Sequence, residues 1–121
     1  MESAFGEVLR AVHARAPEAQ VLLIMGTDGI PVERLALGGD SSLEAAAAEY
    51  VTLLRASLAA GADTELGELH EVAVATERMT TLLVAITPEY FLFAALKPGG
   101  LEGRARHALR LAASRLRSEF T

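Results

Sequence analysis

The sequence predicts an α+β fold in which helices cover both faces of a five-stranded antiparallel sheet. Three observations support this prediction. Segments with helical and strand patterns follow one another in the order α-β-β-α-β-β-β-α. The connections between successive strand-like segments are so short that the strands must pair in antiparallel fashion. The middle strands are apolar on both faces, so we expect neither face of the sheet to be open to solvent.

One helix and two strands are expected in the first part of the chain. The helix is indicated by four apolar residues with the spacing of a single helical face, Phe5, Val8, Leu9 and Val12. It should end before Pro17, because the residue that precedes a proline avoids the helical region. The two strands are expected at residues 19–25 and 32–37, which are β-rich runs on either side of a turn.

The clearest helix of the sequence is the second one, expected at residues 41–60. Ser41 and Glu44 have the spacing of a capping box, in which each side chain accepts a hydrogen bond from a free backbone N–H. Gly61 stands where a left-handed residue would close the helix. Leu43, Ala47, Tyr50, Leu54 and Leu58 would form its buried face.

Three strands and a final helix complete the expected fold. The strands are predicted at residues 68–76, 79–87 and 90–96, with short turns between them. Pro98 introduces the last helix, and a row of apolar residues from Leu101 to Phe120 would face the core.

Composition narrows the class of protein. A chain of 121 residues is expected to form a single domain, residues 1–121. It has no cysteine, which excludes disulfides and thiolate sites, and no apolar run approaches the length of a membrane span. The N-terminus lacks the apolar stretch of a signal peptide, so we expect a cytoplasmic protein with no membrane insertion. The formal charge of −5 argues against a nucleic-acid partner.

Asp28 is the first candidate for chemistry, because it lies between two glycines after an apolar run. A phosphate-binding loop would need more glycines, a lysine and a following helix, whereas here another strand follows. Asp-Gly between two strands is a strong hairpin signal, since Gly29 tolerates positive φ and the aspartate bonds to its own backbone. We therefore interpret Asp28 as the corner of a hairpin.

No catalytic constellation is found. His13, His70 and His107 fall on three different elements, and no two of them have the spacing of metal ligands. The serines lack the nucleophile-elbow motif. The acidic run of Asp63, Glu65, Glu68 and Glu71 is typical of a solvated rim. The expectation is a protein that is not an enzyme and has no catalytic, cofactor-binding or metal-binding residue.

The second helix has an unusual outer face. Opposite its buried side it carries a row of small, uncharged residues, Ala45, Ala48, Thr52, Ala56 and Ala59, with Glu49 and Arg55 beside them. High helix propensity of alanine is one explanation. Close approach of another helix is the alternative that we favour, because small side chains allow it.

Arginines crowd the last helix, at positions 104, 106, 110, 115 and 117. The favoured interpretation is solubility, together with favourable charge near the helix C-terminus. The alternative is a surface for an anionic partner or for lipid headgroups.

The order of elements and two stretches, "VLLIMGTDGIPV" and "LLVAITPEYFLFAALKPGGLEGRARHALRLAASRL", make the chain resemble the Roadblock / dynein light-chain family, including its bacterial MglB-like branch. The resemblance implies a profilin-like sheet, with the second helix on one face and the terminal helices on the other. It further implies a homodimer formed through the second helix and the third strand. The implied interface contains the alanine row together with His70, Val72 and Val74.

The resemblance also implies a partner. Family members bind small Ras-like GTPases as scaffolds, or activate GTP hydrolysis without supplying an arginine finger. For this chain we expect the GTPase to contact Glu49 and Arg55. One alternative is a structural adaptor that pairs with another protein of the same fold, a filament or a motor, independently of nucleotide state. A small-molecule sensor is a third class, which the sequence supports only weakly.

Overall fold

The computed structural model describes residues 4–35, 37, 42–99 and 102–120. Its elements follow the predicted order, with a short 3₁₀ turn, η1, at the end. In chain order they are α1 (Ala4–Arg15), β1 (Ala19–Gly26), β2 (Pro31–Leu35), α2 (Ser42–Ala62), β3 (Glu71–Ala75), β4 (Thr80–Thr87), β5 (Tyr90–Leu96), α3 (Glu102–Arg117) and η1 (Ser118–Phe120).

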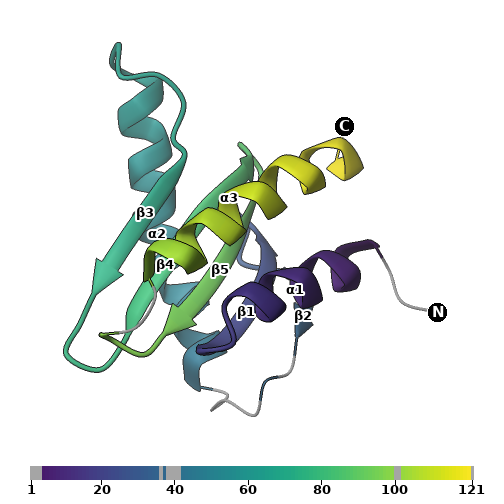
Figure 1. Ribbon diagram of the computed structural model, residues 1–121. Helices are drawn as coiled ribbons and strands as arrows, with labels where there is room; N and C mark the ends of the chain where they lie inside the picture. The colour runs from purple at the N-terminus through teal and green to yellow at the C-terminus, as the bar shows by residue number, and fades with distance from the viewer. Residues whose placement is uncertain (1–3, 36, 38–41, 100–101, 121) are drawn as a thin grey trace.

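The strands form one antiparallel sheet in the order β2-β1-β5-β4-β3. Helices α1 and α3 run antiparallel to each other on one face, and α2 lies alone on the other (Figure 1). The α+β class and the placement of helices on both faces are therefore confirmed. The edges of the sheet are β2 and β3, which lie at opposite ends of the strand order.

Strand periodicity divides the apolar residues into two cores. Alternate residues of β1, β4 and β5, such as Leu22, Leu82 and Leu92, pack under α1 and α3. The residues between them pack under α2, including Leu23, Leu83 and Phe93. Nearly every residue of β1, β4 and β5 is buried on one face of the sheet or the other. Both faces therefore need apolar side chains, which is why these strands are almost unbroken apolar runs in the sequence.

The C-terminal end of α2 differs from the prediction. At the N-terminal end, the predicted capping residue Ser41 lies outside the described residues, and the Glu44 carboxylate accepts a hydrogen bond from Arg34 Nη1 at 3.1 Å. At the other end, the left-handed cap predicted at Gly61 is wrong, because the helix continues to Ala62. The positive φ falls at Gly67, where it is 89°. Gly61 is needed for a different reason: a Cβ there would lie 2.7 Å from the carbonyl oxygen of Gly67.

β2, β3 and α3 are shorter than predicted, and β2, expected at residues 32–37, ends at Leu35. β3 begins at Glu71, so His70 lies just before it, although the His70 carbonyl still accepts the Ala85 N–H at 2.9 Å. α3 ends at Arg117, and Phe120 belongs to η1. There the Phe120 ring stacks against Tyr90 and Phe5, with centroids 4.0 and 5.2 Å away, which ties the end of the described chain to α1 and β5.

Candidate protein–protein interface

The small residues of α2 form an exposed row, as the spacing predicted. All five of them, Ala45, Ala48, Thr52, Ala56 and Ala59, are exposed. The opposite side of the helix is buried through Ala47, Val51 and Leu54. Leu53, next to the row, is 43% exposed and adds a large aliphatic side chain to this surface. The row therefore presents an apolar surface with short side chains, on which a second helix could lie close.

Beside α2, strand β3 offers an unprotected sheet edge. The backbone groups of His70 and Thr76 bond to β4, at Ala85 and Met79. Hydrogen bonding alternates along an antiparallel ladder, so the backbone N–H and C=O groups of Val72 and Val74 also point toward β4. The backbone groups of Glu71, Ala73 and Ala75 point outward, away from β4. The outward edge contains no proline and no bulge, the usual features that prevent edge-to-edge pairing.

The opposite edge, β2, is protected in the usual way. It begins with Pro31, carries Glu33 and Arg34, and has an irregular register between Ile24 and Met25 of its neighbour β1. The contrast between the two edges singles out β3 as the edge suited to pairing with another chain.

The valines predicted for this interface lie on the same face as α2. Val72 packs against the core under α2, and Val74 shares its side of the strand; both are half-buried. His70 is exposed just before the strand. The structure thus brings the apolar row and both valines to one side of the molecule, where α2 and β3 are neighbours (Figure 1).

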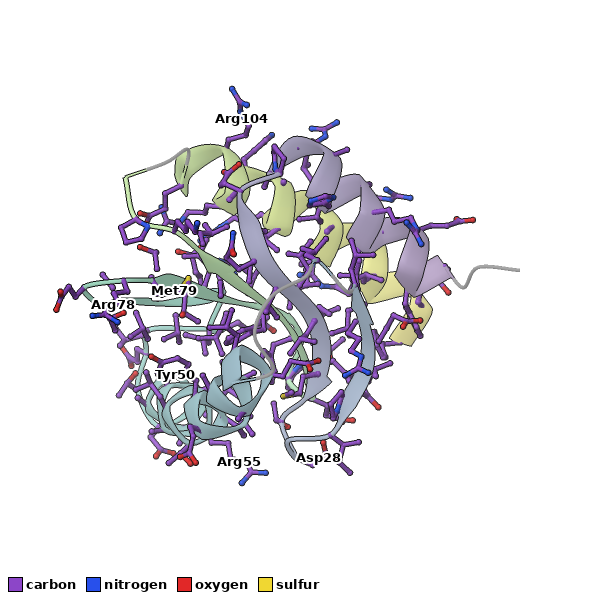
Figure 2. The ribbon with its side chains drawn as sticks, turned by 90° about the horizontal axis from the view of Figure 1, so that it is seen from below. Asp28, Tyr50, Arg55, Arg78, Met79 and Arg104 are labelled. Carbon is purple, nitrogen blue, oxygen red and sulfur yellow. The ribbon has the colours of Figure 1, made fainter. Side chains whose placement is uncertain are left out.

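The two residues predicted to contact a GTPase flank the row on opposite sides. Glu49 is exposed. Arg55 lies on the side toward the β1–β2 turn, near Asp28 (Figure 2), and its Nε donates a hydrogen bond to the Thr27 carbonyl at 2.6 Å. Arg55 therefore links α2 to that turn while its side chain remains accessible.

The β1–β2 turn has the hairpin geometry predicted for Asp28. Gly29 has a φ of 87°, and the Asp28 carboxylate accepts the backbone N–H of Ile30 at 3.0 Å. Within the part of the chain that is described, no group of three or more His, Asp or Glu residues could hold a metal ion. No described helix is long and apolar enough to cross a membrane.

An ion-pair network that the sequence did not reveal fixes β3 to α3. The Glu71 carboxylate, whose side chain is only 13% exposed, accepts hydrogen bonds from Arg106 Nε at 2.6 Å and Arg110 Nε at 3.4 Å. Arg106 also bonds to Glu102 at 3.2 Å. The hydrogen bond to Glu71 is the main reason why the pKa of Arg106 is raised above its ordinary value. The acidic run is therefore not wholly a solvated rim, since Glu71 is structural.

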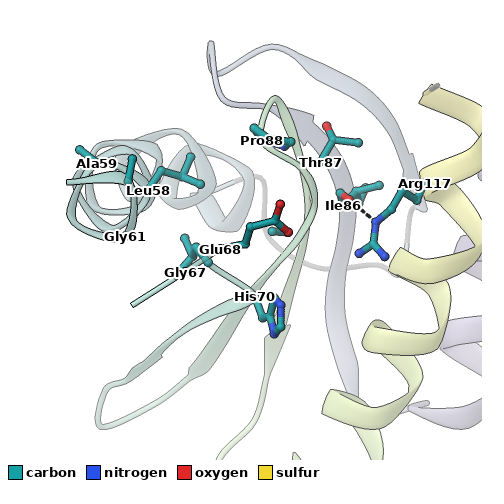
Figure 3. Close-up of a pocket in the computed structure, with 13 residues that line it drawn as sticks. Leu58, Ala59, Gly61, Gly67, Glu68, His70, Ile86, Thr87, Pro88 and Arg117 are labelled. Atoms are coloured by element: carbon teal, nitrogen blue, oxygen red, sulfur yellow. Dashed lines mark hydrogen bonds between the residues drawn. The ribbon is translucent and has the colours of Figure 1, made fainter. Parts of the chain in front are cut away.

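A groove of about 820 Å³ lies between the last turns of α2, residues 67–70 and the β4–β5 turn (Figure 3). Leu58, Leu69 and Ile86 supply apolar wall, and Glu68 and His70 line it on the side that leads into β3. On the α3 side, Arg117 Nε donates to the Ile86 carbonyl at 2.9 Å. That carbonyl lies at an irregularity of β4, between Ala85 and Thr87, where the ladder to β5 shifts register.

Comparison with known proteins identifies the fold. No protein-family model matches the sequence, and no curated protein matches it significantly. Among solved structures, MglC from Myxococcus xanthus is 29% identical over 97% of this chain and 99% of its own, with a TM-score of 0.73. A Roadblock/LC7 domain from Streptomyces avermitilis is 14% identical over 94% of this chain and 95% of its own, with a TM-score of 0.80. The gliding protein MglB from Thermus thermophilus is 17% identical over 98% of this chain and 92% of its own, with a TM-score of 0.81.

These findings define the fold: the chain has the fold of Roadblock/LC7 domains, with an exposed α2 row and an open β3 edge. A profilin from Acanthamoeba castellanii also matches, with a TM-score of 0.53, which agrees with the predicted profilin-like fold. The resemblance that the sequence showed to the Roadblock family is confirmed, and the bacterial MglC and MglB chains among its neighbours support the MglB-like branch.

Proposed function

We propose that this protein is a non-catalytic, homodimeric Roadblock-type regulator or scaffold that binds a small Ras-like GTPase. The observation that supports the proposal most strongly is the combination of an unprotected β3 edge with an exposed row of small residues on α2. The likeness to MglC and to the gliding protein MglB supports the choice of partner class. Activation of GTP hydrolysis belongs to the same proposal.

The proposed dimer follows from the free backbone groups of β3. A two-fold axis through Ala73 lets Glu71 of one chain pair with Ala75 of its copy, so that the two sheets become continuous. The α2 helices then lie on the same face of the joined sheet and meet through their small residues. Burial of Leu53 and of the two valines adds apolar area to this interface.

A single cysteine can test the strand pairing, because the chain has none of its own. Paired antiparallel residues have Cα atoms about 4.5–5.5 Å apart, within the range of about 4.4–6.8 Å that a disulfide accepts. We expect Ala73→Cys to form a disulfide-linked dimer under mild oxidation, seen on a non-reducing gel. Val32→Cys on the β2 edge is the control and should stay monomeric on that gel; equal cross-linking of both variants would remove β3 from the interface.

The helix contact has its own test. In the proposed dimer, Ala48→Glu places two like charges close together in a desolvated contact. This should weaken dimerisation by about 3 kcal/mol or more. Light scattering after gel filtration should show a dimer for the wild type and a monomer for Ala48→Glu. Arg104→Glu, on the far side of the molecule (Figure 2), changes charge without touching α2 and should remain dimeric. A monomeric wild type, or a dimeric Ala48→Glu, contradicts the proposal.

The proposed GTPase surface includes Glu49 and Arg55, on either side of the α2 row. Calorimetry with the cognate GTPase, loaded with GDP or with a GTP analogue, measures whether binding depends on nucleotide. We expect preferential binding of one state, and Glu49→Arg should weaken it because the charge of an exposed contact residue is reversed. Absence of binding in both states at concentrations on the order of 100 µM would exclude a GTPase partner of useful affinity.

A structural adaptor is the second candidate function. It is favoured by the open β3 edge, which would accept another chain of the same fold as well as a copy of its own, and by a structural neighbour described as MglB with tetrameric arrangement. Equal affinity for the GDP-loaded and GTP-loaded forms, or binding only to another Roadblock-type chain, would favour the adaptor over the nucleotide-dependent regulator.

A further inference from the structure

The charges of this acidic protein are strongly segregated. α1 and α3 together contain seven arginines and two glutamates, a formal charge of +5. The whole chain has −5, so the remaining residues carry −10. Because α1 and α3 lie side by side on one face of the sheet (Figure 1), the excess positive charge forms a layer on that face.

The structure distinguishes two groups of arginine in this layer. Arg106 and Arg110 are bound to Glu71, and Arg117 is bound to the Ile86 carbonyl, so these three hold α3 against the sheet. These three arginines therefore lie on the flank of α3 that faces β3 and β4. Arg104 and Arg115, by contrast, are exposed and have no side-chain partner among the described residues.

The two unpartnered arginines of α3 share a helical flank with an exposed leucine. Leu111 lies seven residues after Arg104 and four before Arg115, spacings that place all three on one side of the helix. Leu111 is 43% exposed. Arg15 is the last residue of α1 and is exposed. In Figure 1 the end of α1 and the start of α3 lie at the same end of the helical layer.

We propose that the outer face of α1 and α3 docks on anionic phospholipid bilayers. The two antiparallel helices form a flat layer that can lie along a membrane, with arginines for lipid phosphates and an aliphatic side chain for the interface. The acidic side chains of α2, Glu44 and Glu49, lie on the other side of the sheet from this layer, and Glu71 is already bonded to Arg106 and Arg110. An exposed leucine, rather than an exposed aromatic ring, between the arginines favours lipid over nucleic acid.

The proposal does not require the dimer or the GTPase, since the layer is complete within one chain. Dimerisation through β3 would place two such layers on the same face of the joined sheet and strengthen membrane binding through avidity. Failure of the homodimer and failure of lipid binding are therefore separate results.

Vesicle flotation tests the proposal with the full chain. We expect the protein to float with phosphatidylcholine vesicles that contain about one-third phosphatidylglycerol, and not with phosphatidylcholine alone. Each arginine near the surface contributes about fivefold in partitioning, so Arg104→Gln/Arg115→Gln should reduce binding at least tenfold. Raising the salt concentration from about 0.05 M to about 0.5 M should also release the wild type.

The matched control is Arg34→Gln/Arg78→Gln, which removes the same charge from the β2 edge and the β3–β4 turn and should bind vesicles as the wild type does. Leu111→Ser should lower binding without any change in charge. Absence of flotation by the wild type, or equal loss in the two double variants, overturns the proposal. Binding to duplex DNA in a mobility-shift assay without flotation would show that the layer binds nucleic acid instead.

Discussion

Gly61 and Gly103 both lie inside helices, but their surroundings differ. A Cβ on Gly61 would lie 2.7 Å from a backbone oxygen of Gly67, whereas nothing lies within 4 Å of a Cβ on Gly103. Alanine is favoured over glycine in a helix by about 0.5–1 kcal/mol. We predict that Gly103→Ala stabilises the protein by up to about 0.5 kcal/mol, the gain being reduced by its place in the first turn. Gly61→Ala should destabilise it by about 1 kcal/mol or more.

Urea unfolding of both variants measures this difference. The two substitutions are chemically identical, so a stabilising effect of Gly61→Ala would mean that the end of α2 and Gly67 do not approach closely in solution.

The β1–β2 turn allows a second prediction for single residues. Gly29 has a φ of 87°, a region that is strained for valine, while Asp28 contributes one exposed hydrogen bond to Ile30. We expect Asp28→Ala to lower the free energy of unfolding by about 0.5–1 kcal/mol and Gly29→Val to lower it by about 2 kcal/mol. Chemical denaturation compares the two; an Asp28→Ala loss equal to that of Gly29→Val would indicate a further role for the carboxylate.

Between elements, the contact of Glu71 with Arg106 should be measurable as a coupling energy. The pair is partly screened, because the Arg106 side chain is 34% exposed, so we expect about 0.5–1 kcal/mol from a double-mutant cycle. The substitutions are Glu71→Gln and Arg106→Gln, alone and together, each followed by urea unfolding. The coupling should decrease as salt concentration rises, and a coupling near zero would show that β3 is held by its ladder to β4 alone.

The same elements show what sequence alone could and could not predict. Periodicity located every helix and strand, because apolar spacing is a local property, and β5 was predicted with its observed bounds. The exposed row of α2 was predicted for the same reason, whereas Val72 and Val74 were assigned to an interface only through the family resemblance. Glu71 was not recognised as structural, because its partners lie some 35 residues later and no local pattern marks them. The role of Gly61 was predicted wrongly for a similar reason. What excludes a side chain at Gly61 is the carbonyl oxygen of Gly67, which lies across a turn and is not marked by any local pattern.

For the whole molecule, the proposed dimer makes stability depend on concentration. The free energy needed to unfold a dimer into two unfolded chains rises by about 1.4 kcal/mol per mole of dimer for each tenfold rise in protein concentration. We therefore predict that the thermal midpoint of the wild type rises over a hundredfold range of concentration, measured by circular dichroism. The midpoint of Ala48→Glu should stay constant over that range, and a constant midpoint for the wild type would indicate a monomer.

The strand order also has a consequence for biosynthesis. β1 lies between β2 and β5, yet β1 ends at Gly26 and β5 begins only at Tyr90. While a ribosome makes the intervening residues, the apolar β1 has only β2 beside it, and closing the loop to β5 costs entropy before any central pairing forms. The nascent chain therefore keeps an apolar strand edge open until β5 has emerged, the period in which chaperone binding and aggregation compete with folding.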